Sequence, residues 1–217
     1  MRRSKFAVCV FVAVAAGGCQ TAYYGAMEKI GIPKREILVK RVEDARDDQQ
    51  AAKEQFKSAL EEFTAVTGFK GGKLSEAYDK LSTAYDRSKS KADDVHTSIA
   101  KVDNVAEALF KEWQGELDQY KSEQLRRESA RQLTQTRDRY AQLIAAMKRA
   151  EASIKPVLDT FHDQVLFIKH NLNAQAIASL QGQLSGIESD VGTLIKEMET
   201  AIAKANEFVG EMGKEQA

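Results

Sequence analysis

The sequence contains little cysteine, proline or tryptophan. Its 217 residues include only two cysteines (Cys9 and Cys19), two prolines (Pro33 and Pro156) and one tryptophan. Because both cysteines lie within the first 19 positions, the rest of the chain cannot form a disulfide within itself. Scarce proline, combined with 29% charged residues and frequent Ala, Leu, Glu, Lys and Gln, favours long helices.

Long apolar runs and an excess of one charge are also missing. The apolar run at residues 6–16 is shorter than the roughly 20 residues that a membrane-spanning helix needs. Basic and acidic residues each number 32, and a leader with Arg2, Arg3 and Lys5 would leave three more acidic than basic residues. Charge alone therefore disfavours nucleic acid as a partner.

Motifs that bind phosphate or metal do not occur. The stretch "GFKGGKLS" resembles a phosphate-binding loop, but Thr67 stands where the first glycine belongs and Leu74 follows the lysine where Ser or Thr is required. His96, His162 and His170 lack the spacing of metal ligands. We therefore predict no catalytic residue, no metal site, no cofactor and no enzymatic activity.

The first 19 residues have the pattern of an export signal, with a basic start, an apolar run and small residues before Cys19. The stretch "AAGGC" resembles the lipobox of bacterial lipoproteins, in which the cysteine becomes the first mature residue and carries acyl chains. Ala16 departs from the leucine that is usual there. An unpaired cysteine in an exported chain needs a role, and acylation of Cys19 supplies one. Ordinary secretion, with cleavage at the A-x-A site of residues 13–15, is the alternative.

These features predict three segments: a removed lipoprotein-type leader at residues 1–18, a lipidated segment at residues 19–33 and a helical domain at residues 34–213. More than one acyl chain on Cys19 would give stable membrane anchoring. Gln20 stands where an Asp would imply inner-membrane retention in many Gram-negative bacteria. By resemblance to that sorting rule, we expect the periplasmic face of the outer membrane.

Heptad spacing of apolar residues predicts four long helices. The four apolar stripes run through residues 38–66, 74–113, 133–168 and 177–212. "TGFKGG" and "HNLN" separate the first and last pairs, and Ser122 and Asn173 can cap the third and fourth helices. The predicted fold is all-α, with four long antiparallel helices that form two coiled-coil hairpins packed as an elongated bundle.

The register of the first hairpin places Gln49 opposite Ser88, the two polar residues of its stripes. The second helix is longer than the first, so its last apolar residues need another cover. We expect that cover from Leu125 and Leu133 of the third helix and from residues 22–32. The residues to be covered are Val102, Leu109, Phe110, Trp113 and Leu117.

Up-down-up-down threading puts Cys19, the turn at residues 120–123 and the C-terminus at one end of the bundle. The loops "GFKGG" and "HNLN" then lie together at the other end, away from the membrane. Their residues Phe69, Lys70, Lys169 and His170 form a candidate contact site for a protein partner.

Small residues form a stripe on the fourth helix: Ser179, Gly182, Gly186 and Ser189. We expect another helix to approach closely there, either from this chain or from a partner such as a second copy in a homo-oligomer. Pro156 should kink the third helix or mark its restart.

Three aromatic residues allow two interpretations each. Trp113 fits the core better than an exposed docking patch. Tyr23 and Tyr24 fit either the membrane interface, where amphipathic rings settle, or packing against Trp113.

Several stretches resemble an uncharacterised family of Gram-negative lipoproteins, known as domain of unknown function 2959. They are "CQTAYYGAMEKIGI", "VEDARDDQQAAKEQFKSAL", "AEALFKEW", "QLIAAMKRAEA" and "KHNLNAQAIASL". The resemblance implies an envelope lipoprotein and brings no activity, cofactor or catalytic residue with it. We therefore expect a membrane-anchored structural or adaptor protein. A regulator that docks on an envelope enzyme or assembly machine is the alternative, and an enzyme comes third.

Overall fold

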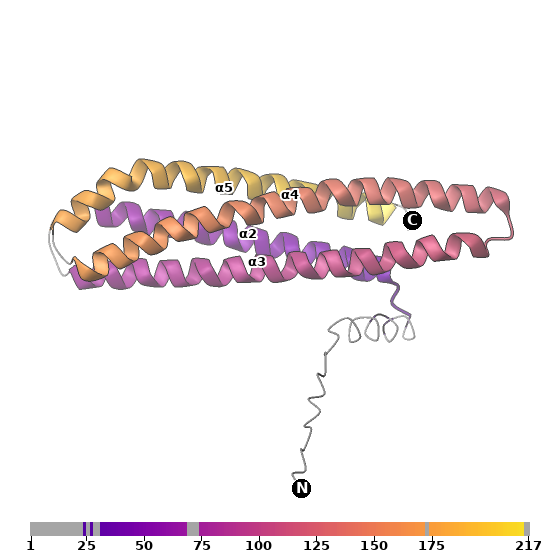
Figure 1. Ribbon diagram of the computed structural model, residues 1–217, viewed down its shortest axis with the longest axis horizontal. Coiled ribbons are helices and arrows are strands. Elements are labelled where there is room, and N and C mark those ends of the chain that lie inside the picture. The colour runs from indigo at the N-terminus through magenta and orange to yellow at the C-terminus, as the bar shows by residue number, and fades with distance from the viewer. Residues whose placement is uncertain (1–23, 25–26, 28–30, 69–73, 172–173, 215–217) are drawn as a thin grey trace, which may run out of the picture.

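The computed structural model describes Tyr24, Met27 and residues 31–68, 74–171 and 174–214. These residues form four long α-helices and one short 3-10 helix, and none of them lies in a strand. The elements are α2 (Lys34–Thr67), α3 (Leu74–Glu116), η1 (Leu117–Gln119), α4 (Glu123–His170) and α5 (Ala174–Lys214) (Figure 1). The predicted all-α fold with four long helices is confirmed.

The helices end where local groups satisfy their free backbone atoms. Pro33 precedes α2, and its carbonyl oxygen accepts a hydrogen bond of 3.0 Å from the backbone N–H of Glu36. Ser122 caps α4 as predicted, because its hydroxyl oxygen accepts from the backbone N–H of Leu125 at 3.4 Å. Asn173, the predicted cap of α5, lies outside the described residues.

The long helix α4 continues without a break through Pro156. Proline cannot donate the backbone hydrogen bond of a helix interior, and Pro156 lies on an exposed face where water can reach the freed carbonyl. The predicted restart of the helix at this residue is therefore wrong, whereas the kink stays a prediction.

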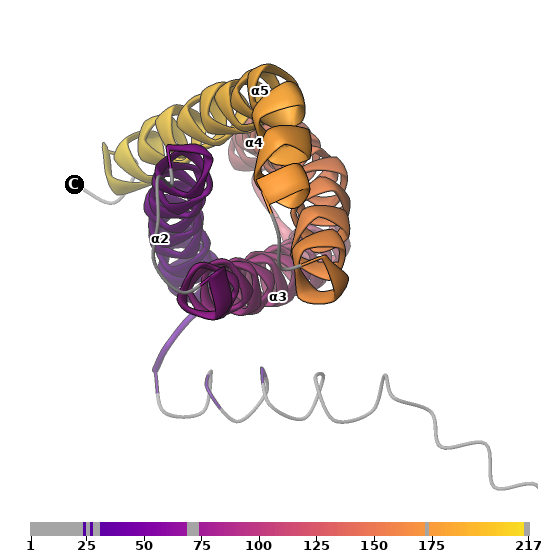
Figure 2. The same ribbon diagram turned by 90° about the vertical axis from the view of Figure 1, so that its left-hand side faces the viewer.

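The four helices form a ring. The helix α2 packs against α3 and α5, and α4 packs against the same two, so α2 and α4 occupy opposite corners (Figure 2). Ion pairs join neighbouring helices on the surface, such as Lys53 with Glu199 at 3.5 Å and Arg149 with Glu197 at 3.8 Å. The two predicted hairpins are thus closed into a single bundle.

The two ends of the bundle differ. At one end, called the far end, α2 and α4 finish and α3 and α5 begin (Figure 1). There the side-chain amide of Gln181 donates a hydrogen bond of 2.6 Å to the carbonyl oxygen of Thr67. The other end, called the base, holds the start of α2, the turn between α3 and α4, and the end of α5. This is the arrangement that up-down-up-down threading predicts.

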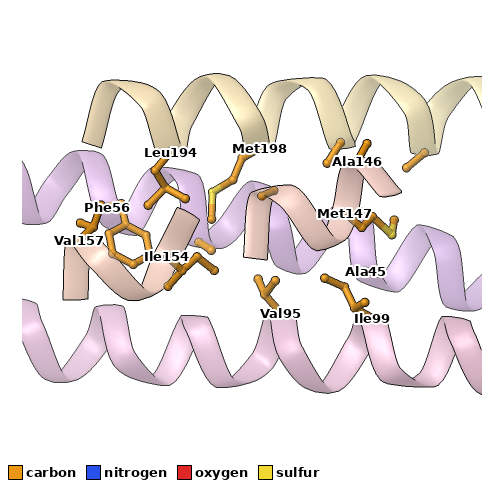
Figure 3. Packing of buried hydrophobic residues seen from close by; sticks show 14 of the residues in the cluster. Ala45, Phe56, Val95, Ile99, Ala146, Met147, Ile154, Val157, Leu194 and Met198 are labelled. Atoms are coloured by element: carbon orange, nitrogen blue, oxygen red, sulfur yellow. The ribbon is translucent and has the colours of Figure 1, made fainter. Parts of the chain in front are cut away.

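The core changes in composition along the bundle. Toward the far end it is aromatic: Phe63 and Phe161 stack with ring centroids 4.4 Å apart, and Phe56 lies 6.3 Å from Phe161. Further along, alanine, methionine and branched aliphatic side chains fill the space between the helices (Figure 3). The fully buried residues of this middle part include Ala45, Ala52, Ala150, Ala201, Ala205, Met147 and Met198.

The helices α3 and α4 continue past the other two at the base (Figure 1). An ion pair between Lys34 and Glu112 marks the start of α2, and one between Arg139 and Glu211 at 3.9 Å marks the end of α5. Residues 113–135, which lie beyond these pairs, are called the base extension. At 1.5 Å per residue, the 43 residues of α3 span about 65 Å.

The prediction of which residues cover the apolar end of α3 is only partly correct. Leu133 is 2% exposed and Tyr24 is 8% exposed, and the half-buried Met27 and Ile32 pack against the same core. Leu125, in contrast, is 57% exposed, so its predicted role is wrong. The physical reason is that every residue from 121 to 128 faces solvent in the first turns of α4.

Gln49 and Ser88, which the register places opposite each other, are not joined by a hydrogen bond. Both residues are fully buried, but neither polar atom of the Gln49 side-chain amide has a hydrogen-bond partner. The Ser88 hydroxyl instead donates to the carbonyl oxygen of Ala84 at 2.8 Å and accepts from the Gln55 amide at 3.5 Å. A buried amide without partners lowers stability.

Candidate functional surfaces

The candidate lipidation residue, Cys19, lies outside the described residues, as does Tyr23. The described part of the N-terminal segment packs onto the protein, because Tyr24 belongs to the hydrophobic core. Of the two interpretations of Tyr24, packing against the protein is therefore the one that its burial favours. The backbone N–H of Ile32 donates to the carbonyl oxygen of Met27 at 3.0 Å, next to the start of α2.

Trp113 packs against the core of the base, as predicted. Its side chain is half-buried, and the indole N–H donates a hydrogen bond of 2.8 Å to the hydroxyl oxygen of Ser129 on α4. A tryptophan in the interior usually finds such a partner for its single donor. The ring joins α3 to α4 and is not presented as an isolated surface patch.

Two of the four candidate contact residues at the far end are described. Lys169 and His170 occupy the last turn of α4 and are exposed, whereas Phe69 and Lys70 lie outside the described residues. The preceding turn adds two exposed apolar side chains, Leu166 at 40% and Phe167 at 39%. The sequence analysis missed these two, although "VLFIKH" holds more apolar residues than one buried face of a helix can accommodate.

The small-residue stripe of α5 faces solvent, and Ser179, Gly182, Gly186 and Ser189 are all exposed. A methyl group added at Gly182 or Gly186 would meet no atom of another helix within 4 Å. Among the described residues, then, no helix approaches this stripe, and the version of the prediction that used a helix of this chain is wrong for them. Contact with a partner helix stays a prediction.

Two of the histidines lie between α3 and α4. His96 Nδ1 lies 2.5 Å from a carboxylate oxygen of Glu151, and the ring of His162 lies 5.2 Å from that of Tyr85. In the described part of the chain, no group of three or more His, Cys, Asp or Glu side chains could hold a metal ion. Both histidines serve to connect the two helices.

A polar cluster joins α3 to α4 where the base extension meets the bundle. The carboxylate of Asp103 accepts hydrogen bonds from the Tyr140 hydroxyl and the Lys148 ammonium group. Partial burial favours the neutral acid, but these two bonds outweigh it and hold the pKa of Asp103 below its usual range. Burial, reinforced by the bond to Asp103, raises the pKa of the Tyr140 phenol.

An open groove of about 570 Å³ runs beside this cluster, lined by Ala100, Asp103, Asn104, Glu107, Phe110 and Tyr140. The Tyr140 hydroxyl and the Asp103 carboxylate are bonded to each other, and neither is presented as a free nucleophile or base. Nearby, the Arg137 guanidinium lies 5.6 Å from the centre of the Phe110 ring and donates to the backbone carbonyl of Phe110 at 3.1 Å. The cluster therefore acts as a structural tie.

The length and apolar character of the described helices determine whether any of them could act as a membrane-spanning helix. Among the residues that the structure describes, no helix combines the length and apolar character that crossing a bilayer requires. The candidate surfaces among the described residues are the exposed far end and the solvent-facing stripe on α5.

The geometry defines an all-α protein: an elongated four-helix bundle with a two-helix extension at its base. The family model for a protein of unknown function (DUF2959) matches residues 23–212, and the chain belongs to this family. The predicted membership of domain of unknown function 2959 is thereby confirmed. No curated protein and no solved structure matches the chain.

Proposed function

We propose that this chain is a periplasmic lipoprotein, anchored through acylated Cys19 to the periplasmic face of the outer membrane. It acts as a structural or adaptor protein through contacts between surfaces and not through catalysis. A membrane and an envelope protein are its proposed partners, and nucleic acid is not.

The observation that carries this proposal is the order of residues before Cys19. A basic start, an apolar run too short to span a bilayer and the small residues "AAGGC" follow one another as in lipoprotein leaders. The shape of the bundle supports the adaptor role. At 1.5 Å per residue, the 48 residues of α4 span about 70 Å, so the far end is well separated from the base.

Metabolic labelling with an alkyne fatty acid tests the anchor. We expect the wild-type protein to be labelled and Cys19→Ala to lose the label, because acylation uses this thiol. The matched control is Cys9→Ala, which removes the other cysteine of the chain and should leave labelling unchanged. Labelling that survives in Cys19→Ala would refute the attachment site.

A second candidate function is regulation of an envelope enzyme or assembly machine through the far end. The exposed Phe167 next to the exposed Leu166 favours it, because aromatic side chains are enriched at protein interfaces. A photo-crosslinking amino acid at position 167 should capture one specific protein in cells. The same group at Asp138, an exposed residue of the same helix, is the control. Capture of an envelope enzyme would favour the regulator, and no specific adduct at 167 would contradict both the regulator and an adaptor that uses the far end.

A further inference from the structure

The turn of the base extension presents two large apolar side chains to solvent. Leu125 is 57% exposed and Tyr120 is 41% exposed, and among the described residues only Leu166 and Phe167 at the far end are comparable. The neighbouring Leu117 is 8% exposed. Exposure is therefore particular to Tyr120 and Leu125 and is not shared by every apolar residue near the turn. Exposed Leu and Tyr at the tip of a hairpin suit a surface that meets an apolar medium.

Charged side chains of both signs surround these two residues, and the acidic ones include Asp118, Glu123 and Glu128. Lys121, Arg126 and Arg127 are exposed, and Arg126 and Arg127 both pair with the carboxylate of Glu123, at 3.1 and 3.8 Å. Such side chains can extend their charged ends toward water while their stems lie along apolar surface. Tyrosine, leucine and basic residues together are the composition found at a membrane–water interface.

The chain before the described residues limits how far the base can lie from the acylated residue. Only residues 20–23 separate Cys19 from the buried Tyr24. Five extended steps of the backbone reach about 17 Å. We call residues 19–24 the tether. Because Met27 is hydrogen-bonded to Ile32 next to the start of α2, the point where the tether joins the protein lies near the base.

The turn extends further than the start of α2. The ion pair between Lys34 and Glu112 places the start of α2 beside that part of α3, and Tyr120 follows Glu112 by eight residues. At about 1.5 Å per residue, the turn therefore projects roughly 12 Å beyond the start of α2. Figure 1 shows this turn as the outermost point of the base. Its projection is similar to the reach of the tether.

We propose that the turn from Tyr120 to Arg127 docks on the lipid headgroup surface when Cys19 is acylated. The occupant of this surface is the bilayer itself, because the short tether keeps the base within reach of it. The protein then contacts the membrane at two points, and the far end points away from it. This inference rests on the proposed lipid anchor.

An environment-sensitive dye tests the contact. Acylation occupies Cys19 of the mature chain, so Leu125→Cys supplies a single free thiol for the dye. The acylated protein is reconstituted in vesicles of phosphatidylethanolamine and phosphatidylglycerol. We expect the dye emission to shift to shorter wavelength and to be lost when the vesicles contain lipids with a shallow quencher. Gln183→Cys, at an exposed position of α5 far from the base, is the matched control and should show neither change.

The outcomes separate the docking of the turn from the anchor. The mass of the N-terminal peptide shows whether Cys19 is acylated, and it is measured before the dye emission. A peptide without acyl chains would refute the proposed anchor. In acylated protein, a dye at position 125 that stays as exposed to water as one at position 183 overturns the docking of the turn. Quenching at 183 without quenching at 125 overturns it as well, because the far end would then meet the lipid.

Discussion

The four-helix body and the base extension bury their side chains to different degrees. In the body each helix faces two neighbours, and Phe56, Phe161 and Leu194 are completely buried. In the base extension α3 and α4 lack the other two helices, and Trp113 and Ala130 remain half-buried. Leu133 is buried there, but two helices enclose fewer side chains than four, so apolar burial stabilises this part less.

Hydrogen bonds supplement this packing at the base. The Trp113 indole bonds to Ser129, and Arg137 bonds to Gln114 at 3.1 Å as well as to the backbone of Phe110. The body contains the opposite case, since the fully buried amide of Gln49 has no hydrogen-bond partner. Volume changes should therefore be most costly in the body, and loss of single polar groups should be most visible at the base.

The largest effect is expected for Phe161→Ala. This ring is fully buried and lies against Phe56 and Phe63, so its removal leaves a cavity in the aromatic part of the core. Truncations of this kind lower the free energy of unfolding by about 3–5 kcal/mol. Urea denaturation followed by circular dichroism measures the loss.

Phe167→Ala is the matched control on the same helix, because its ring is 39% exposed. Its effect should stay within about 0.5 kcal/mol, as is usual for surface positions. Equal losses at 161 and 167 would contradict the aromatic core of the body.

Gln49→Met comes next and should stabilise the protein. Methionine has nearly the shape of glutamine but no amide that must be stripped of water on burial. An unsatisfied buried polar group costs about 1–3 kcal/mol, so the midpoint of urea unfolding should rise by a corresponding amount. Gln50→Met, at the exposed neighbouring position, should leave the midpoint unchanged. A destabilised Gln49→Met would show that the amide has a partner after all.

A smaller and more local effect is expected at the base. Trp113→Phe keeps an aromatic ring but removes the donor to Ser129, and a double-mutant cycle with Ser129→Ala should give a coupling of about 1 kcal/mol. Amide hydrogen exchange should rise in the base extension and stay unchanged in α2 and α5. If the two losses in free energy of unfolding were simply additive, the bond between Trp113 and Ser129 would not stabilise the base.

The sequence predicts the helices and their buried faces well, because heptad spacing recurs along each of them. It also predicts the cap at Ser122 and the projecting end of α3, since the first helix is visibly shorter. These features depend on local pattern and on chain length, both of which one sequence contains.

The errors arise where tilt and rotation of whole helices decide the contact. The bond from Gln55 to Ser88 was not predicted, because heptad position does not encode which polar side chains bond. Leu125 has the right spacing to cover α3, yet the first turns of α4 face solvent. The small-residue stripe on α5 likewise has no helix beside it among the described residues, because small side chains permit close packing without requiring it.

The smallest expected effect concerns the tie between α3 and α4. Despite partial burial, bonds from Lys148 and Tyr140 lower the pKa of Asp103 in the folded protein. The stabilisation is therefore fully present above the unfolded pKa of about 3.9 and is lost as the pH falls through the lower, folded value. Asp103→Asn should cost less than about 1 kcal/mol at neutral pH, since this carboxylate is partly exposed.

Urea unfolding at several pH values measures this cost, and the difference between wild type and Asp103→Asn should shrink to zero in acid. Asp138→Asn, at an exposed carboxylate on α4, controls for the change in net charge and should show a smaller difference at every pH. If the gap between wild type and Asp103→Asn instead widened as the pH fell, the carboxylate would be held by burial and not by its two donors. The base would then depend on apolar packing as the body does, and the contrast between the two regions would fail at the point where they meet.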